Sequence, residues 1–207
     1  MRFRRHFRLL GCCLLAAQAW AAGDLAYTGK VGAGETVIDT RPLDACRQAS
    51  LPGARCLPPA ELLGPARGLP SERDLLWLFG TLGLTGGESV LVAGDTASGR
   101  DFVAGLLHLS GQQSVRVLDR PLTPLLSARA DAAPGETRAL VRTAVYTAPM
   151  RDALWIVHPD ELAGQTDGSA ILAADAYTAI IRFTRHVAAG KPAVRVGWNL
   201  SSGSLTR

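Results

Sequence analysis

The chain has 207 residues, of which 47% are hydrophobic and 19% are charged, and its formal net charge is +4. This composition is typical of a globular protein and excludes a low-complexity or largely disordered chain. Residues 1–22 contain four arginines and no acidic residue, so the rest of the chain has 18 basic and 18 acidic residues. That formal neutrality argues against a nucleic-acid or anionic-membrane partner.

Residues 1–22 have the pattern of a secretory signal peptide. A basic segment over residues 2–8 precedes an apolar run over residues 9–17, and Ala19-Trp20-Ala21 provides the small residues of a cleavage site. The apolar run is too short to span a bilayer, which takes about 20 residues, and no other segment is long enough. A lipoprotein attached through Cys12 is a less favoured alternative, because only two leucines separate the basic segment from Gly11-Cys12. We therefore expect an exported, periplasmic protein without a membrane span.

Two cysteines, Cys46 and Cys56, remain after removal of this leader. In an oxidising compartment such a pair is consistent with a disulfide, which over so short a loop would contribute about 2–3 kcal/mol. Two other interpretations stay open: two buried thiols, or one reactive thiol. The histidines His108, His158 and His186 are scattered without the spacing of metal ligands, so we expect no metal and no cofactor.

Strand and helix patterns alternate through the middle of the chain. The predicted strands are short and apolar, and the predicted helices have an apolar face. The strands are residues 36–39, 56–57, 89–93 and 114–118; the helices are residues 42–48, residues 71–82 with Ser71 as the cap, and the segment that Gly111 ends. This order predicts an α/β fold in which a parallel sheet is flanked by helices. Ligands of such sheets bind beyond the carboxyl ends of the strands.

The loop over residues 94–100 lies at such a strand end. The apolar residues 90–93 lead directly into it, and it opens the following helix. Stacked N–H groups at the start of a helix form a cradle for an anion. A small anion is therefore a candidate ligand of the loop residues Asp95, Thr96, Ala97, Ser98, Gly99 and Arg100.

Three short motifs lie in order within residues 30–127: Asp39-Thr40-Arg41, Leu51-Pro52-Gly53-Ala54 and Val117-Leu118-Asp119-Arg120-Pro121. Together with the 94–100 loop they resemble the rhodanese-like family of sulfurtransferases, although the histidine before the second motif and two glycines of the third are lost. The family's active-site loop reads Cys-x-x-Gly-x-Arg; here Asp95 stands at the cysteine position, with Arg100 at the expected distance. The resemblance implies the rhodanese-like fold and a bracing role for Asp39 and Arg41 near the site.

The chemistry of that family requires a thiolate that attacks a sulfur donor and holds a persulfide. Asp95 cannot carry a transferable sulfur, and Thr96 and Ser98 have no nearby base in the sequence and are expected to satisfy loop hydrogen bonds. For Asp95 we favour a carboxylate that fills the cradle, accepts the loop N–H groups and pairs with Arg100. The alternative is that Asp95 turns outward and leaves an anion site formed by Arg100 and the backbone.

The last 80 residues are predicted to add a smaller α/β appendage. Residues 128–136 have the composition of a linker, and residues 137–207 form the appendage. Its predicted elements are strands at 137–147, 155–157, 169–174 and 193–198, a short helix at 158–162, and an amphipathic helix at 176–189. Because residues 167–172 resemble the opening strand of a second family repeat, the appendage resembles a truncated repeat. An independent α+β module is the alternative, but so few residues are marginal for a separate core.

Three functional hypotheses follow. The favoured one is an exported rhodanese-like protein without sulfurtransferase activity, which acts as a binding or scaffold partner of an unidentified protein in periplasmic sulfur or redox metabolism. The second is an active thiosulfate or mercaptopyruvate sulfurtransferase that uses Cys46 or Cys56, which a disulfide between them would exclude. The third is a hydrolase that uses Asp95 as base or nucleophile.

Overall fold

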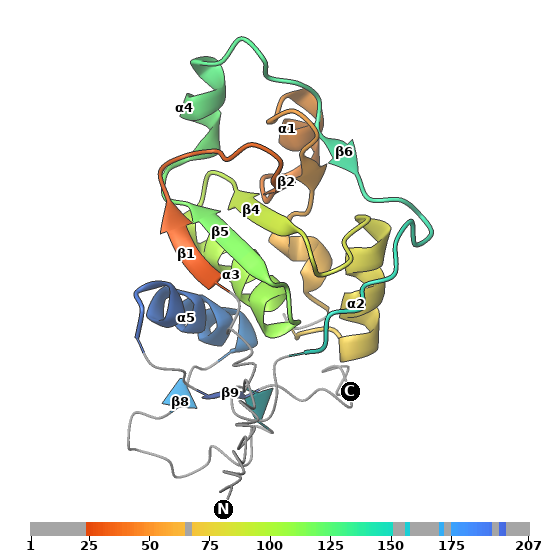
Figure 1. The fold of residues 1–207 in the computed structure, drawn as a ribbon, viewed down its shortest axis with the longest axis vertical. Coiled ribbons are helices and arrows are strands. Elements are labelled where there is room, and N and C mark those ends of the chain that lie inside the picture. The colour runs from red at the N-terminus through yellow and green to blue at the C-terminus, as the bar shows by residue number, and fades with distance from the viewer. Residues whose placement is uncertain are drawn as a thin grey trace, which may run out of the picture.

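A computed structural model describes residues 24–64, 68–150, 156–157, 170–171, 175–191 and 195–197. Its main body is a six-stranded sheet in the order β1-β5-β4-β2-β3-β6, and all neighbouring strands run parallel (Figure 1). The strands are β1 (Asp24–Thr28), β2 (Thr36–Asp39), β3 (Arg55–Cys56), β4 (Ser89–Ala93), β5 (Ser114–Leu118) and β6 (Glu136–Thr137). The predicted α/β fold with a parallel sheet flanked by helices is confirmed.

Each face of this sheet has its own core. Alternate residues of a strand point to opposite faces, so Val90 and Val92 of β4 lie in one core while Leu91 and Ala93 lie in the other. The helices are α1 (Leu43–Gln48), the 3-10 helix η1 (Pro59–Leu62), α2 (Glu72–Thr81), α3 (Ala97–Leu109), α4 (Leu122–Ser127) and α5 (Ala176–Ala188). Side chains of α2, α3 and α5 fill the first core, and those of α4 fill the second.

Local signals set the starts of the predicted helices. The Ser71 side chain caps α2 by accepting a hydrogen bond from the N–H of Asp74, as the sequence predicted. Thr96 caps α3 in the same way through the N–H of Gly99.

The strand β1 was not predicted. It lies at one edge of the sheet, so the main body starts before residue 30.

The predicted strand over residues 137–147 is wrong beyond its first residue. β6 ends at Thr137, and the chain then runs along α2 (Figure 1). The N–H of Ala139 donates to the carbonyl of Thr81, and the N–H groups of Thr143 and Ala144 donate to that of Gly80. The last carbonyls of a helix have no partner within the helix, so they accept hydrogen bonds from these N–H groups. The segment is therefore bonded to the end of α2 and not to a neighbouring strand.

The segment predicted as a linker is joined to the main body. Ala133 forms a two-way antiparallel bridge with Ser50, and the N–H of Gly135 donates to the carbonyl of Cys46. Residues 128–136 therefore lead into β6 at the far edge of the six-stranded sheet rather than separating two bodies.

The C-terminal elements form a second, three-stranded parallel sheet in the order β7-β9-β8. Its strands are β7 (Ile156–Val157), β8 (Ala170–Ile171) and β9 (Arg195–Gly197). The predicted amphipathic helix is confirmed as α5, which packs against α3 and β1 (Figure 1). The predicted signal peptide and the helix at 158–162 lie outside the described residues. None of the helices in the described part is long and apolar enough to cross a membrane.

Candidate functional site

The 94–100 loop lies at the carboxyl end of β4, between the ends of β2 and β5. Two hydrogen bonds hold its start: the N–H of Thr40 donates to the carbonyl of Ala93 (2.8 Å), and that of Leu122 donates to Gly94 (3.1 Å). Glycine is required at position 94, because a Cβ there would lie 2.0 Å from the hydroxyl of Thr40. The segment that follows β2 therefore packs closely against the start of this loop.

Asp95 points away from the loop and toward α4. Its Oδ1 accepts from the N–H of Thr123 (2.8 Å), and its Oδ2 accepts from the Thr123 hydroxyl (2.7 Å). The expectation that this carboxylate fills the cradle and pairs with Arg100 is therefore wrong. The physical reason lies in α4, whose N-cap residue Pro121 offers no side-chain cap, so Asp95 caps that helix from 28 residues away.

The surroundings of Asp95 favour its charged form. Partial burial by itself raises the pKa of Asp95, but the two hydrogen bonds from Thr123 and the positive charge of Arg41 outweigh it and lower the pKa below the usual value. A carboxylate with a lowered pKa is a poor proton acceptor near neutral pH. This weakens the form of the hydrolase hypothesis in which Asp95 acts as the base.

Asp39 and Arg41 form a buried ion pair at the end of β2. The Asp39 side chain is fully buried and that of Arg41 is 5% exposed, and their shortest contact joins Nη2 to Oδ2 at 2.6 Å. The hydroxyl of Ser50 also donates to Asp39 (2.7 Å). Arg41 Nη1 donates to the hydroxyl of Thr123 (3.1 Å), which in turn donates to Asp95. One polar network therefore connects the ends of β2 and β4 with the start of α4.

Arg100 holds the backbone of the loop. Its Nη1 donates to the carbonyl of Gly94 (2.7 Å), while its Nε is buried and has no hydrogen-bond partner. Burial lowers the pKa of Arg100, although Asp101 and Tyr27 oppose that shift. The hydroxyl of Thr40 is also buried without a hydrogen-bond partner.

These donors surround the start of α3. Thr96 satisfies the N–H of Gly99, whereas the N–H groups of Ala97 and Ser98 belong to the first turn, which has no carbonyl partners within the helix. Ala97 is exposed and Ser98 is half-buried. The arrangement brings several hydrogen-bond donors together, and it holds no nucleophile of the thiol type.

Cys46 of α1 and Cys56 of β3 are joined in a disulfide, with their Cα atoms 5.9 Å apart. Both residues are fully buried. Gly135 covers the bridge, since a Cβ at that position would lie 2.5 Å from the Cys46 sulfur. Neither sulfur is therefore available as a thiolate in this structure, which removes the carrier that the second functional hypothesis requires.

A second polar cluster lies where β1 and α5 meet α3. The sequence analysis did not predict it. The carboxylate of Asp101 accepts from the Tyr27 hydroxyl (2.9 Å) and from Arg185 Nε (2.7 Å), and its backbone carbonyl accepts from Thr184 (2.7 Å). Burial first, and the hydrogen bond to Asp101 second, raise the pKa of Tyr27 to about 12. The cluster fastens α5 and β1 to α3, so its role is to connect these elements.

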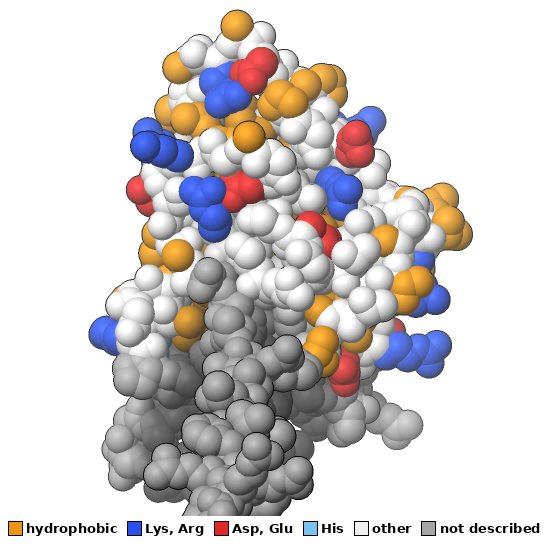
Figure 2. Space-filling view, viewed as in Figure 1, with side chains coloured by type: hydrophobic (Ala, Val, Ile, Leu, Met, Phe, Trp, Pro, Cys, Tyr) orange, Lys and Arg blue, Asp and Glu red, His pale blue; other side chains and the backbone are white. Residues whose placement is uncertain are grey.

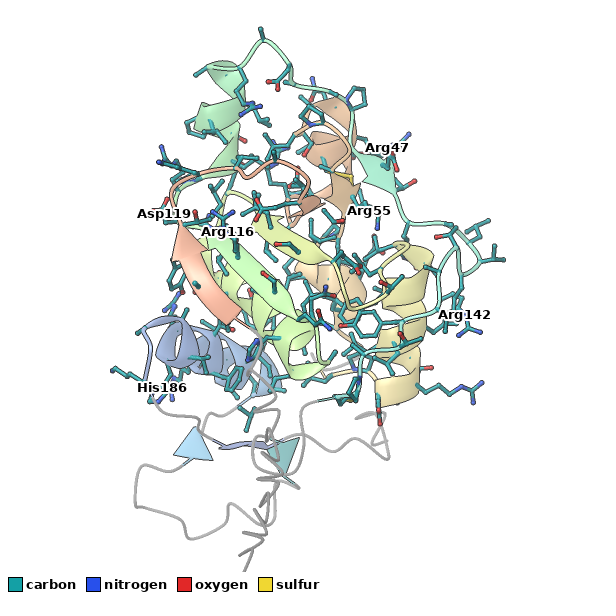
Figure 3. All side chains as sticks on the ribbon, in the orientation of Figure 1. Arg47, Arg55, Arg116, Asp119, Arg142 and His186 are labelled. Carbon is teal, nitrogen blue, oxygen red and sulfur yellow. A yellow bond between two sulfur atoms is a disulfide. The ribbon has the colours of Figure 1, made fainter. Side chains whose placement is uncertain are left out.

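Two of the four histidines, His108 and His186, lie in the described part of the chain. His108 is buried, with its ring 6.0 Å from that of Phe183, and His186 is half-buried on α5 (Figure 3). His158 lies outside the described residues. Within the described ranges, no three His, Cys, Asp or Glu side chains form a group that could hold a metal ion.

Comparison with solved structures identifies the fold. The structure of YnjE is 18% identical, with a TM-score of 0.54, over 66% of this chain and 34% of that one. SseA from Escherichia coli, described as a 3-mercaptopyruvate sulfotransferase with the "rhodanese" fold, is 14% identical, with a TM-score of 0.50, over 67% of this chain and 58% of its own. A variant of EanB in complex with ergothioneine is 15% identical, with a TM-score of 0.53, over 70% of this chain and 37% of its own.

This chain therefore has the rhodanese fold, as the three motifs implied. At these identities the likeness carries the fold alone, and the chain spans between 34% and 58% of the lengths of those proteins. No protein-family model matches the sequence. No curated protein sequence matches it at a significant level.

Proposed function

We propose that this chain is an exported rhodanese-fold protein that lacks sulfurtransferase activity and serves as a binding or scaffold partner in periplasmic sulfur or redox metabolism. The proposal rests on Asp95, which the resemblance places at the family's nucleophile position; the observation that supports it is that its carboxylate caps α4 through Thr123. The export is supported by the sequence pattern of residues 1–22.

The chemistry of sulfur transfer explains why this residue matters. In the first step a thiolate attacks the outer sulfur of thiosulfate, the sulfur–sulfur bond of the donor breaks, sulfite leaves, and a persulfide remains on the protein. A carboxylate forms no such persulfide. The only cysteines outside residues 1–22, Cys46 and Cys56, are bonded to one another, so neither provides the thiolate unless the disulfide is first reduced.

The rest of the site supports binding rather than turnover. The unpartnered hydroxyl of Thr40, the buried guanidinium of Arg100 and the first N–H groups of α3 offer donors to a small anion. Asp95 leaves this cradle free because its carboxylate is bonded to Thr123. We propose that a small oxyanion, or an anionic group of a protein partner, occupies it.

The test is an assay of cyanide-dependent thiocyanate release with thiosulfate and with 3-mercaptopyruvate as donors. The protein is recovered from the periplasmic fraction of a bacterial host that expresses the full chain, and recovery there is the first expected result. Wild type, Cys46→Ser and Cys56→Ser should all release no thiocyanate above the buffer rate, while SseA serves as the positive control. Activity in wild type that is lost in one cysteine variant would overturn the proposal.

Asp95→Cys is the matched variant of this assay. We expect it to gain measurable release, because the loop N–H groups and Arg100 remain in place to lower the pKa of the new thiol. A folded Asp95→Cys protein without any gain would show that the cradle itself has lost the geometry of sulfur transfer. That outcome would contradict the retained cradle but not the inactivity of the wild type.

A further inference from the structure

A small cavity lies where β3 and β6, at the edge of the six-stranded sheet, meet the C-terminal end of α2. Its volume is ~170 Å³, and polar side chains line it, among them Arg55, Glu136, Thr137 and Thr143. Figure 3 shows Arg55 between β6 and α2. No residue of the 94–100 loop belongs to this lining. Sites for drug-sized ligands measure about 300–1,000 Å³, so this cavity suits only a small molecule.

The half-buried guanidinium of Arg55 brings a positive charge to the cavity. Its Nη1 donates to the carbonyl of Leu82, the C-cap residue of α2, where the helix dipole is negative. A guanidinium has five N–H donors, and Arg55 makes no other hydrogen bond and no ion pair with the residues that the structure describes. Its remaining donors are therefore open to a ligand.

Glu136 brings a negative charge to the same cavity. In the parallel pairing of β3 with β6 it lies directly opposite Arg55, so the two side chains leave the same face of the sheet, on strands about 4.8 Å apart. The two residues nevertheless form no ion pair, because Arg55 is held at the end of α2. The Glu136 carboxylate is exposed and has no hydrogen-bond partner within the described ranges. Each charge is thus left for another partner.

Gly83 keeps the space beside Arg55 open. Its φ is +70°, which favours glycine, and a Cβ there would lie 3.2 Å from the hydroxyl of Thr143 and 3.3 Å from Arg55 Nη1.

The other charged side chain of the lining, Arg138, is neutralised by Glu61 at 2.6 Å. Figure 2 shows acidic side chains close to basic ones on the right-hand side of this view. The cavity therefore presents one unpaired positive charge, one unpaired negative charge and threonine hydroxyls, with no net charge.

We propose that this cavity binds a small zwitterion of the α-amino acid class. The carboxylate of the ligand accepts hydrogen bonds from Arg55, and its ammonium group donates to Glu136. A simple anion is attracted by Arg55 and repelled by Glu136, and a simple cation meets the reverse, so only a ligand with both charges suits both groups. The short distance between the strands favours an α-amino acid over a molecule with its charges at the ends of a long chain.

Amide NMR titrations of isotope-labelled protein, produced from the full chain, test the inference with three ligands on one carbon skeleton. L-Alanine carries both charged groups, propionate lacks the ammonium group, and ethylamine lacks the carboxylate. We expect L-alanine to shift the amide signals of Gly83, Thr137 and Thr143 with a Kd of about 1 mM or lower. Propionate and ethylamine should bind at least about tenfold more weakly.

Glu136→Gln assigns the ammonium contact. It keeps the size of an exposed side chain, so it should fold normally, and it should weaken L-alanine binding at least about tenfold without weakening that of propionate. Arg55→Gln, which keeps a donor for Leu82, should weaken the binding of both ligands. Asp44→Asn removes an exposed carboxylate of α1 outside the cavity and is the matched control, with unchanged affinity.

Three results would overturn the inference. They are the absence of shifts at the lining residues with L-alanine, equal affinities for L-alanine and propionate, and an unchanged affinity in Glu136→Gln. The thiocyanate assay concerns the 94–100 loop and the cysteines, so the inference and the proposed function can fail independently.

Discussion

Asp95 and Asp101 lie six residues apart on either side of the start of α3, yet their surroundings differ sharply. The Asp95 carboxylate is mostly exposed and meets one residue, Thr123, in hydrogen bonds to its N–H and hydroxyl groups. The Asp101 side chain is 2% exposed and holds Tyr27 and Arg185 together. The Asp95 carboxylate joins the 94–100 loop to α4. The Asp101 carboxylate joins α3 to β1 and α5.

Charge contributes differently to stability at these two positions. A solvent-exposed carboxylate has water as an alternative partner, so its hydrogen bonds contribute little net free energy. A buried carboxylate has no such alternative, and losing a partner leaves an unpaired group away from water. We therefore expect substitution of Asp95 to cost less stability than substitution of Asp101.

The largest effect is expected at Arg41, on which the Asp95 network rests. Arg41→Met should lower the free energy of unfolding by about 3–5 kcal/mol, because it leaves the fully buried Asp39 without its ion pair. Urea denaturation followed by circular dichroism measures this loss. Arg129→Met is the control: it breaks an exposed pair with Asp131 and should leave the free energy of unfolding nearly unchanged. Equal losses in the two variants would contradict the importance of burial.

Asp101→Ala should cost about 2–3 kcal/mol, because Tyr27 and Arg185 lose a charged hydrogen-bond partner at the junction of three elements. Hydrogen exchange should locate the loss in α5 and β1. Asp119→Ala, which removes an exposed carboxylate, should stay within about 0.5 kcal/mol of wild type. If protection in α5 were unchanged in Asp101→Ala, the junction would not depend on this carboxylate.

Asp95→Asn should cost the least, about 0.5–1 kcal/mol at neutral pH, as expected for a helix cap on the surface. Because the folded-state pKa of Asp95 is lower than its ordinary value of 3.8, the carboxylate stabilises the fold above that value. This contribution decreases as the pH falls below 3.8 toward the lowered pKa. Thermal melts should therefore show a Tm difference between the two proteins at pH 7 that narrows below pH 3.8. A difference independent of pH would contradict the role of the charge.

Much of the central fold could be predicted from the sequence alone. The strands β2, β4 and β5 are short runs rich in Val and Ile, and α2 and α3 combine an apolar face with a local cap, Ser71 or Thr96. These signals act between residues close in the chain, which is why the apolar pattern located both helices and the Ser71 cap located the start of α2. The rhodanese fold was implied by the resemblance of the three motifs and the 94–100 loop to the rhodanese-like family, and solved structures with that fold match this chain.

The rest was decided by tertiary structure. Thr123 takes the Asp95 carboxylate because α4 starts without a cap of its own, and no local pattern links residues 28 positions apart. The course of residues 138–150 depends on hydrogen bonds to the free carbonyls at the end of α2. The disulfide depends on the distance between the Cα atoms of Cys46 and Cys56, which only the fold sets. Local sequence patterns thus predict the layers of the sheet and the place of Asp95 just after a buried strand. Only the folded chain decided what that residue binds, because its partner comes from another element.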